Sequence, residues 1–221
     1  MVVRVAVLAS GGGSNLQAIV DAVAEGRLTA EVVAVVSDRP DAGALVRAAR
    51  VGIPAIAVPR RPDERRADYD RRLADVVAAT GAERVVLAGW MRLLTMAFLG
   101  RFPEAVINLH PARPGELPGV DAIERAWVEA REGARTSTGV MVHFVPDEGI
   151  DDGPVLAAVD VPILPDDALA TLAARVHAAE HGLLVDVLVS LCSTSSRSPA
   201  TPAPCGRSLV GARSLASEGT A

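Results

Sequence analysis

The chain has 221 residues, of which 50% are hydrophobic and only 3% aromatic, so its core must be built mainly of Ala, Val and Leu. Its formal net charge of −5 and its pI near 5.4 argue against a nucleic-acid-binding protein, because such proteins usually carry a basic stripe. The chain contains no lysine, which excludes a phosphate-binding loop of the G-x-x-x-x-G-K-[ST] type and a Schiff-base lysine.

The N-terminus and the apolar runs indicate a soluble protein. The first ten residues, MVVRVAVLAS, do not resemble a signal peptide, because the apolar run is short and leads directly into glycines. No uncharged apolar run reaches the roughly 18 residues that would indicate a membrane span. We therefore expect a cytoplasmic protein with no membrane partner. Cys192 and Cys205 both fall in a Ser/Pro-rich stretch, so we expect neither a zinc cluster nor a cysteine nucleophile, and no metal site.

Apolar β-branched runs alternate with helical segments from residue 2 to residue 132. Strands are predicted at residues 2–9, 31–37, 53–58, 84–88 and 105–109, and helices at residues 16–25, 42–50, 60–79, 96–101 and 120–132. Asp63 is the expected N-cap of the third helix. This alternation predicts an α/β fold with a doubly wound, mostly parallel sheet and helices on both faces.

The pattern changes after residue 132. Residues 136–145 and 155–161 are predicted to be neighbouring strands joined by the acidic loop 146–154, without a helix between them. Residues 166–191 are predicted to form a long amphipathic helix, with Asp166 or Asp167 as its cap. The composition then changes to Ser, Pro and Thr, which predicts a poorly ordered tail over residues 192–221.

A glycine-rich loop, SGGGSN at residues 10–15, separates the first strand from the first helix. It matches a dinucleotide-binding loop poorly, because Leu16 occupies the position of the third glycine and Asp38 comes after the expected acidic position. Phosphate is a better ligand, since unpaired N–H groups and the helix dipole attract anions to a helix N-terminus. The alternative is a tight turn that binds nothing.

The strand at residues 105–109 delivers Asn108 and His110 to its carboxyl end, where open α/β sheets bind their ligands. The two residues are two positions apart and therefore share a face. If Asp151 of the acidic loop adjoins them, its carboxylate would fix the tautomer of His110 and raise the pKa of that imidazole. An amide, an imidazole and a carboxylate together suit acyl-type transfer. The alternative is a structural amide and an ordinary edge histidine.

Several other residues have simpler interpretations. His143 is predicted to be a buried strand histidine rather than a proton carrier, and His181 a helix-face residue. Trp90 and Phe144 are predicted to belong to the core, and the arginines of residues 60–72 to a solvated helix face.

Five motifs occur along the chain in this order: SGGGSNLQAI, LAGWMRLL, INLHP, TGVMVHFVPDEGIDDGP and ARVHAAEH. Together they resemble the 10-formyltetrahydrofolate-dependent formyltransferases over roughly residues 3–190. INLHP with a later D-x-G-P is shared by the wider group, whereas SGGGSNLQ is similar to the branch that formylates glycinamide ribonucleotide. The resemblance implies a Rossmann-like catalytic domain over residues 1–191, small-molecule substrates, no nucleic acid, no metal, and a monomer or homodimer.

The resemblance also implies residue roles. Asn108 would hydrogen-bond the formyl oxygen, His110 would be the general acid, and Asp151 would orient it. The ribonucleotide would be held by Gly13, Ser14, Asn15, His177 and Glu180. The folate would be held by Arg66, Met91, Arg92, Leu93, Leu94, Asn108, Pro146, Asp147 and Asp151. The amine of glycinamide ribonucleotide would attack the formyl carbon of 10-formyltetrahydrofolate directly, in de novo purine biosynthesis, and release tetrahydrofolate.

One segment departs from the family pattern. Residues 112–119 read ARPGELPG, where the family usually continues with two apolar residues and a proline in place of Arg113, Pro114 and Gly115. Three other functions stay open: the formyl-transfer domain of a methionyl-tRNA formyltransferase, a formyltetrahydrofolate hydrolase, and a non-catalytic nucleotide-binding module. The acidic net charge counts against the first, and only the altered segment favours the last.

Overall fold

The computed structural model describes residues 2–194, and most of the predicted tail at residues 192–221 lies outside that range. Within it, seven strands form one sheet in the order β3-β2-β1-β4-β5-β6-β7. The strands are β1 (Val3–Leu8), β2 (Ala30–Ser37), β3 (Ala55–Ala57), β4 (Arg84–Leu87), β5 (Val106–His110), β6 (Ser137–Phe144) and β7 (Val155–Pro162). The helices are α1 (Ser14–Ala24), α2 (Gly43–Arg50), α3 (Arg66–Ala79), α4 (Met96–Leu99), α5 (Ala122–Arg131) and α6 (Leu169–Thr194).

The predicted doubly wound, mostly parallel sheet is confirmed. Strands β1 to β5 pair in parallel, and β6 and β7 add to that sheet as antiparallel neighbours. Every predicted strand and helix is present, with differences at the ends. Antiparallel pairing of β6 and β7 follows from the absence of a helix between them, since a parallel connection would need a crossover.

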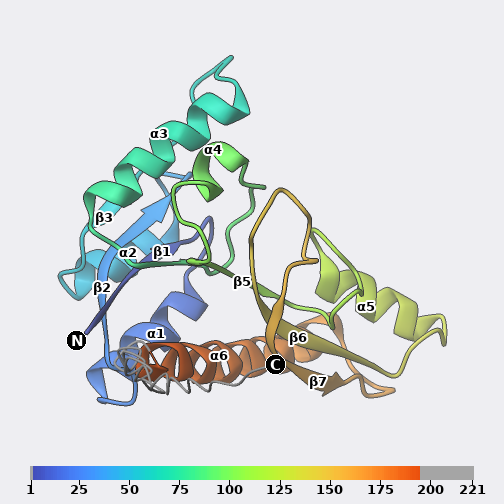
Figure 1. Cartoon of the computed structure of the whole chain (residues 1–221). Helices are drawn as coiled ribbons and strands as arrows, with labels where there is room; N and C mark the ends of the chain where they lie inside the picture. The colour runs from blue at the N-terminus through green and yellow to red at the C-terminus, as the bar shows by residue number, and fades with distance from the viewer. Residues whose placement is uncertain (1, 195–221) are drawn as a thin grey trace, which may run out of the picture.

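Two hydrophobic cores lie on opposite faces of the sheet. One contains apolar residues of α1, α2, α5 and α6, and the other contains those of α3 and α4. Figure 1 shows α3 and α4 above the sheet and α1 and α6 below it. Alternation along β5 turns Ile107 and Leu109 toward the first core and Val106 toward the second. Asn108 and His110 therefore emerge on the α3–α4 side.

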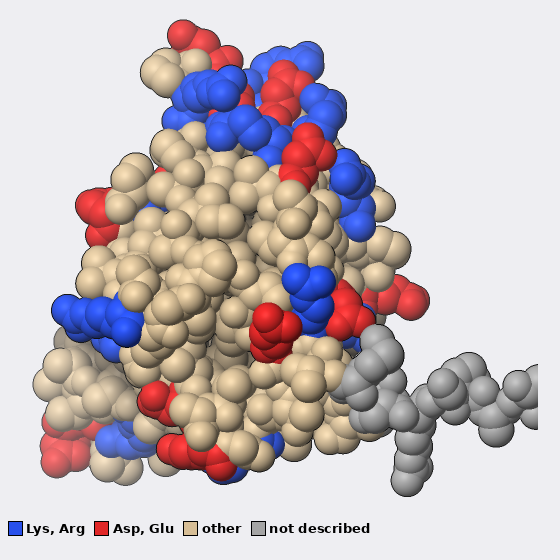
Figure 2. Space-filling view, turned by 90° about the vertical axis from the view of Figure 1, so that its left-hand side faces the viewer, with Lys and Arg blue, Asp and Glu red and all other residues tan. Residues whose placement is uncertain are grey.

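Two predicted helix starts are wrong. The third helix was expected from residue 60 with Asp63 as its cap, but α3 begins at Arg66 and Asp63 has a left-handed backbone (φ 58°). Residues 60–65 instead fold around Glu64, whose carboxylate accepts hydrogen bonds from the Arg61 N–H and the Arg72 guanidinium. Side chains that satisfy a turn in this way compete with helix formation. Figure 2 shows basic and acidic side chains interleaved at this end of the molecule.

The last helix also differs from its prediction. Its first turn begins after Ala168, whose carbonyl accepts from the N–H of Thr171 and Leu172, so neither Asp166 nor Asp167 is the cap residue. The Asp167 carboxylate accepts the Leu164 N–H at 2.7 Å and the Thr171 hydroxyl at 2.9 Å, which ties the preceding loop to the helix. At the other end α6 continues to Thr194, so Cys192 is a buried helical residue and not part of a tail.

Helix α6 is long and apolar enough to span a membrane by length and composition alone, over Leu169–Ser193. This helix contains charged residues, so a search for uncharged apolar runs does not identify it. In the fold, Leu172, Val176, Leu184 and Leu188 of this helix are buried in the core against the sheet. Its hydropathy is therefore that of a core helix.

Candidate active site

A cavity of about 780 Å³ opens at the carboxyl ends of β1, β4 and β5. The chain leaves β1 toward the α1 side of the sheet and leaves β4 toward the α4 side, so the cavity lies at the topological switch point of the sheet, where α/β proteins bind ligands. Most of the predicted site residues line it: Gly13, Ser14, Asn15, Met91, Arg92, Leu93, Leu94, Asn108, His110, Asp147, Asp151, His177 and Glu180. Arg66 and Pro146 do not.

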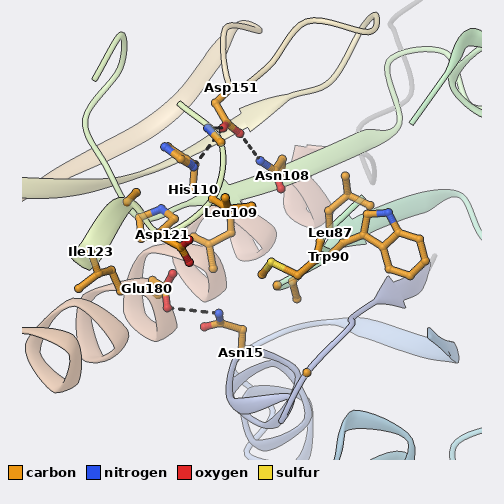
Figure 3. A pocket seen from close by; sticks show the side chains of 18 of the residues that line it. Asn15, Leu87, Trp90, Asn108, Leu109, His110, Asp121, Ile123, Asp151 and Glu180 are labelled. Carbon is orange, nitrogen blue, oxygen red and sulfur yellow. Dashed lines mark hydrogen bonds and ion pairs between the residues drawn. The ribbon is translucent and has the colours of Figure 1, made fainter. Parts of the chain in front are cut away.

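Asp151 joins Asn108 and His110 in one hydrogen-bonded cluster (Figure 3). Its Oδ1 accepts the Asn108 Nδ2 at 2.9 Å, and its Oδ2 lies 3.2 Å from His110 Nδ1. The Gly119 N–H donates to Oδ2 at 2.8 Å. The structure therefore brings together the three residues that the sequence placed on two separate segments.

His143 completes this cluster and was not predicted to take part. It is buried, as expected, but it pairs directly with Asn108 across β5 and β6, and its Nε2 lies 3.1 Å from Asn108 Nδ2. Its Nδ1 faces the carbonyl of Phe144 at 2.8 Å, and a carbonyl only accepts, so the neutral ring carries its proton on Nδ1. Nε2 is then an acceptor for Asn108. Only the register of β5 against β6 reveals this contact.

Both ring nitrogens of His110 face acceptors. Nε2 donates to the Leu117 carbonyl at 3.0 Å, so the exchangeable site is Nδ1, opposite Asp151. Burial lowers the pKa of the His110 imidazole, and the Asp151 charge raises it, as predicted, but Asp151 and the Leu117 carbonyl together do not cancel the effect of burial, so the net pKa is lowered and not raised. His110 therefore rests as a neutral imidazole at neutral pH.

The pKa of the Asp151 carboxyl is lowered, which keeps this group charged. Burial on its own would raise the pKa of Asp151, but the hydrogen bond that His143 donates when it is protonated, the Gly119 N–H and the charge of a protonated His110 outweigh burial and lower it. Asp151 therefore remains ionised beside a neutral imidazole.

Three non-glycine residues around the site have left-handed backbones: Leu117 (φ 46°), Asp121 (φ 57°) and Asp151 (φ 53°). Such a conformation costs about 1–2 kcal/mol for an ordinary L-residue. It persists only where surrounding contacts hold it, and strained residues of this kind cluster at functional sites. Leu117 and Asp151 each contact His110 directly.

The glycine loop has the geometry of an anion site. Gly13 precedes α1 with φ 76°, and the first turn of that helix has no side-chain cap. The carbonyls of Gly11 and Gly12 turn away toward α2, where they accept the Ala44 N–H at 3.1 Å and Arg47 Nε at 2.8 Å. The uncapped end of α1 is thereby left to face the cavity.

A second polar group lies across the cavity from Asn108. Glu180 of α6 is buried and its Oε2 accepts His177 Nδ1 at 2.7 Å and Asn15 Nδ2 at 3.4 Å (Figure 3). The hydrogen bond to Glu180 raises the pKa of His177, against a smaller opposing effect of burial. The buried Asn15 Oδ1 has no partner among the described residues.

The segment after β4 forms another wall of the cavity and carries exposed apolar side chains, Met91 and Leu93. The Met91 N–H donates to Ser10 Oγ at 3.0 Å, which joins this segment to the glycine loop. The Arg92 guanidinium pairs with Asp38 at 2.6 Å, and Arg66 Nε donates to the Leu93 carbonyl at 3.1 Å. Arg66 therefore supports this wall from outside the cavity.

No group of three or more His, Cys, Asp or Glu side chains within residues 2–194 is arranged to hold a metal ion. The cluster around Asn108 contains groups that donate and accept hydrogen bonds and can exchange a proton. An amide beside a carboxylate and two imidazoles is suited to a reaction in which charge develops on a carbonyl oxygen and a proton changes place.

The chain is similar to known proteins over most of its length. Residues 3–188 match the family described as Formyl transferase. A phosphoribosylglycinamide formyltransferase of Schizosaccharomyces pombe is 42% identical over 200 residues, which are 85% of this chain and 96% of that protein. The trifunctional purine biosynthetic protein adenosine-3 of Drosophila melanogaster is 39% identical over 180 residues, 80% of this chain and 13% of that protein. The crystal structure of glycinamide ribonucleotide transformylase 1 from Symbiobacterium toebii has a TM-score of 0.82 at 36% identity, and the match covers 87% of this chain and 89% of that one.

Proposed function

Because the chain belongs to the formyl transferase family, which it matches over residues 3–188, we propose that it is a phosphoribosylglycinamide formyltransferase of purine biosynthesis. It transfers the formyl group of 10-formyltetrahydrofolate to the primary amine of glycinamide ribonucleotide. The catalytic domain includes all of α6, to Thr194, and not only residues 1–191. It acts in the cytoplasm as a monomer or homodimer and uses the folate as a second substrate.

One observation supports this function above the others. The cluster of Asn108, His110 and Asp151 shares a single cavity with the uncapped N-terminus of α1 and with Glu180. A phosphate, a sugar hydroxyl and a reacting amine belong to one ribonucleotide, and they need an anion site, an acceptor and a proton-transfer group within reach of each other. The cavity holds all three.

The reaction needs neither a metal nor a covalent enzyme intermediate. The amine nitrogen attacks the formyl carbon, a new C–N bond forms, and the carbonyl oxygen becomes negative in a tetrahedral intermediate. The bond from that carbon to N10 of the folate then breaks, and N10 takes up a proton. The products are the N-formyl ribonucleotide and tetrahydrofolate. Holding both substrates in one cavity lowers the entropic cost of their encounter.

Asn108 stabilises the negative oxygen. In the resting site the amide donates to Asp151 Oδ1 and points its other hydrogen at His143 Nε2, and it rotates as a unit to donate to the formyl oxygen as charge develops on it. Asp151 thus orients the amide as well as the imidazole.

His110 and Asp151 move the proton. The neutral imidazole takes up the proton that the attacking amine loses, and the proton is held between Nδ1 and Asp151 Oδ2. The resulting imidazolium then acts as the general acid toward N10. The lowered pKa of His110 suits this sequence, because the ring starts as a base and becomes a stronger acid once it is charged.

The two substrates occupy different walls of the cavity. The phosphate lies at Gly13, Ser14 and Asn15, and Glu180, held by His177, accepts from the sugar hydroxyls. The folate lies along the wall after β4 and the acidic loop, with contacts from Met91, Arg92, Leu93, Leu94, Asn108, Asp147 and Asp151 and with Arg66 at its outer edge, whereas Pro146 does not line the cavity.

The proposal is tested by measuring tetrahydrofolate release from 10-formyltetrahydrofolate with and without glycinamide ribonucleotide. We expect release that depends on the ribonucleotide and yields one formylated product for each tetrahydrofolate. Equal release without the ribonucleotide would identify a hydrolase. No release under either condition, with both substrates still bound, would identify a binding module.

A further inference from the structure

The segment that departs from the family pattern, residues 112–119, contacts both members of the proton-transfer pair. Its Leu117 carbonyl accepts from His110 Nε2, and its Gly119 N–H donates to Asp151 Oδ2. Leu117 makes its contact from a left-handed backbone that an unsupported leucine would leave. Something must therefore hold this part of the segment in place.

Arg113 is fixed at the start of the segment. Its Nε donates to Asp160 of β7 at 2.6 Å, and its Nη2 donates to Ser137 Oγ of β6. The strand register puts three further residues on the sheet face that carries Asn108 and His110. They are Ser137, Gly139 and Asp160. A Cβ at Gly139 would lie only 2.6 Å from Arg113 Cγ, so β6 leaves space for the arginine stem.

Glu116 is fixed from another direction. Its Oε2 accepts from Arg135 Nη1 at 3.0 Å, and Arg135 in turn pairs with Glu129 of α5 at 2.6 Å. Arg113 and Glu116 also approach each other at 3.6 Å across a turn closed by the Glu116 N–H and the Arg113 carbonyl. Glu116 immediately precedes Leu117, and Arg113 lies four residues before it.

We propose that Arg113 and Glu116 are positioning residues that hold the Leu117 carbonyl against His110 Nε2. This contact keeps a proton on Nε2 in both charge states of the ring. All proton exchange is then directed to Nδ1, opposite Asp151. Arg113 stands where the family usually has an apolar residue, so an ionic anchor holds this segment here and the site stays competent. The catalytic part of this inference rests on the proposed formyl transfer.

The experiment compares Arg113→Ala with a matched control, Arg101→Ala. Arg101 also pairs with an aspartate, Asp75, at 2.9 Å on the surface, and it does not line the cavity. We expect Arg113→Ala to lower kcat about tenfold while KM for both substrates changes less than about threefold, because the variant misplaces a proton-transfer group and leaves the binding walls intact. Glu116→Gln should act in the same direction, and Arg101→Ala should leave kcat unchanged.

A second readout does not depend on activity. The chain has four histidines, so ¹⁵N-labelled histidine gives a simple spectrum in which the His110 Nε2–H is protected from exchange with water. This signal is assigned by its loss in His110→Gln. It should disappear or exchange faster in Arg113→Ala and stay in Arg101→Ala. If the wild-type protein proves inactive, the proposed function fails, but the spectrum still tests the anchor.

Two outcomes would overturn the proposal. One is an Arg113→Ala protein with unchanged kcat and an unchanged His110 signal. The other is a lowered kcat with the His110 signal intact, since the arginine would then act by another route. If Arg113→Ala does not fold, Asp160→Asn is the variant that tests the proposal. It weakens the ion pair between Arg113 and Asp160 on the exposed edge strand and leaves the arginine side chain in place. It should lower kcat about threefold and speed exchange of the His110 signal, and no change in either would overturn the proposal.

Discussion

Asn108 on β5 stands directly opposite His143 on β6, and its amide nitrogen lies 3.1 Å from the imidazole Nε2. The same nitrogen donates to Asp151 at 2.9 Å, so both amide hydrogens are used inside the resting site. The amide is thereby held with its nitrogen toward the carboxylate, because an ionised carboxylate cannot donate in return.

His143→Leu should lower kcat about tenfold. It removes the acceptor that orients the second amide hydrogen of Asn108 and leaves a half-buried donor unpaired. His143→Gln, which retains a side-chain acceptor, should recover part of this loss. Steady-state kinetics of the two variants provide the check. Equal activity of the leucine variant and the wild type would show that Asn108 needs no orientation by His143.

Asp151→Asn should lower kcat at least about a hundredfold. The amide has a single acceptor oxygen, so it can replace only one of the two contacts, to Asn108 or to Gly119, and it lacks the negative charge that favours a proton on His110 Nδ1. Isothermal titration should find both substrates bound within about threefold of the wild-type affinity, since neither binding wall changes. Normal turnover in this variant would remove Asp151 from the proton-transfer pair.

The pH profile of kcat should reflect the lowered pKa of His110. Burial lowers the pKa of this imidazole below its ordinary value of 6.5, so the ring is still neutral at pH 6.5. Activity should therefore stay level down to pH 6.5 and fall only at lower pH. An acid limb centred at or above 6.5 would contradict this assignment.

The lowered pKa of His110 also makes the stability of the fold depend on pH. The unfolded ring takes up its proton near 6.5 and the folded ring takes it up at lower pH, so the unfolded state binds more protons in that interval. The free energy of unfolding should therefore fall as pH drops through the interval. Urea denaturation of wild type and His110→Gln across this range should show a weaker pH dependence in the variant.

Arg47→Ala should raise KM for the ribonucleotide about tenfold and leave KM for the folate unchanged. The guanidinium donates hydrogen bonds to the Gly12 carbonyl at 2.8 Å and to Gln17 Oε1 at 3.1 Å, so it fixes the orientation of the glycine loop. Arg50→Ala, an exposed arginine near the end of the same helix, is the matched control. A similar rise in KM for the ribonucleotide in both variants would indicate that the effect comes from a general loss of positive charge and not from the orientation of the loop.

Gly13→Ala should destabilise the protein by at least about 1–2 kcal/mol, the cost of a left-handed alanine. Its φ is 76°, and a Cβ there would lie 2.7 Å from Ala44 Cα. Gly12→Ala is the comparison, because a Cβ at Gly12 meets nothing within 4 Å. Thermal denaturation should show a clearly lower Tm for the first variant only. Equal Tm values would mean that the loop does not need its close approach to α2.

Much of the fold was predictable because local signals agreed with one another. Apolar runs bounded by glycine and proline identify β1, β4 and β5, and the absence of a helical segment before β7 predicts that it lies next to β6. The predictions failed where one side chain reorganised its neighbours. Glu64 closes residues 60–65 into a turn, and Asp167 ties a loop ahead of α6.

The sequence by itself determined which residues could do chemistry. Few histidines and no lysine limit the choices, and the two-residue spacing of Asn108 and His110 puts them on one face of a strand whatever the rest of the chain does. The glycine loop likewise predicted an uncapped helix N-terminus.

Only the tertiary structure decided how those residues act. The register of β5 against β6 brings His143 to Asn108, and burial lowers the pKa of His110 although a carboxylate stands beside it. The Leu117 carbonyl reaches His110 from a segment whose anchors lie on β6, on β7 and beyond α5. Desolvation and hydrogen bonding depend on everything that surrounds a group, and those surroundings come from distant parts of the chain.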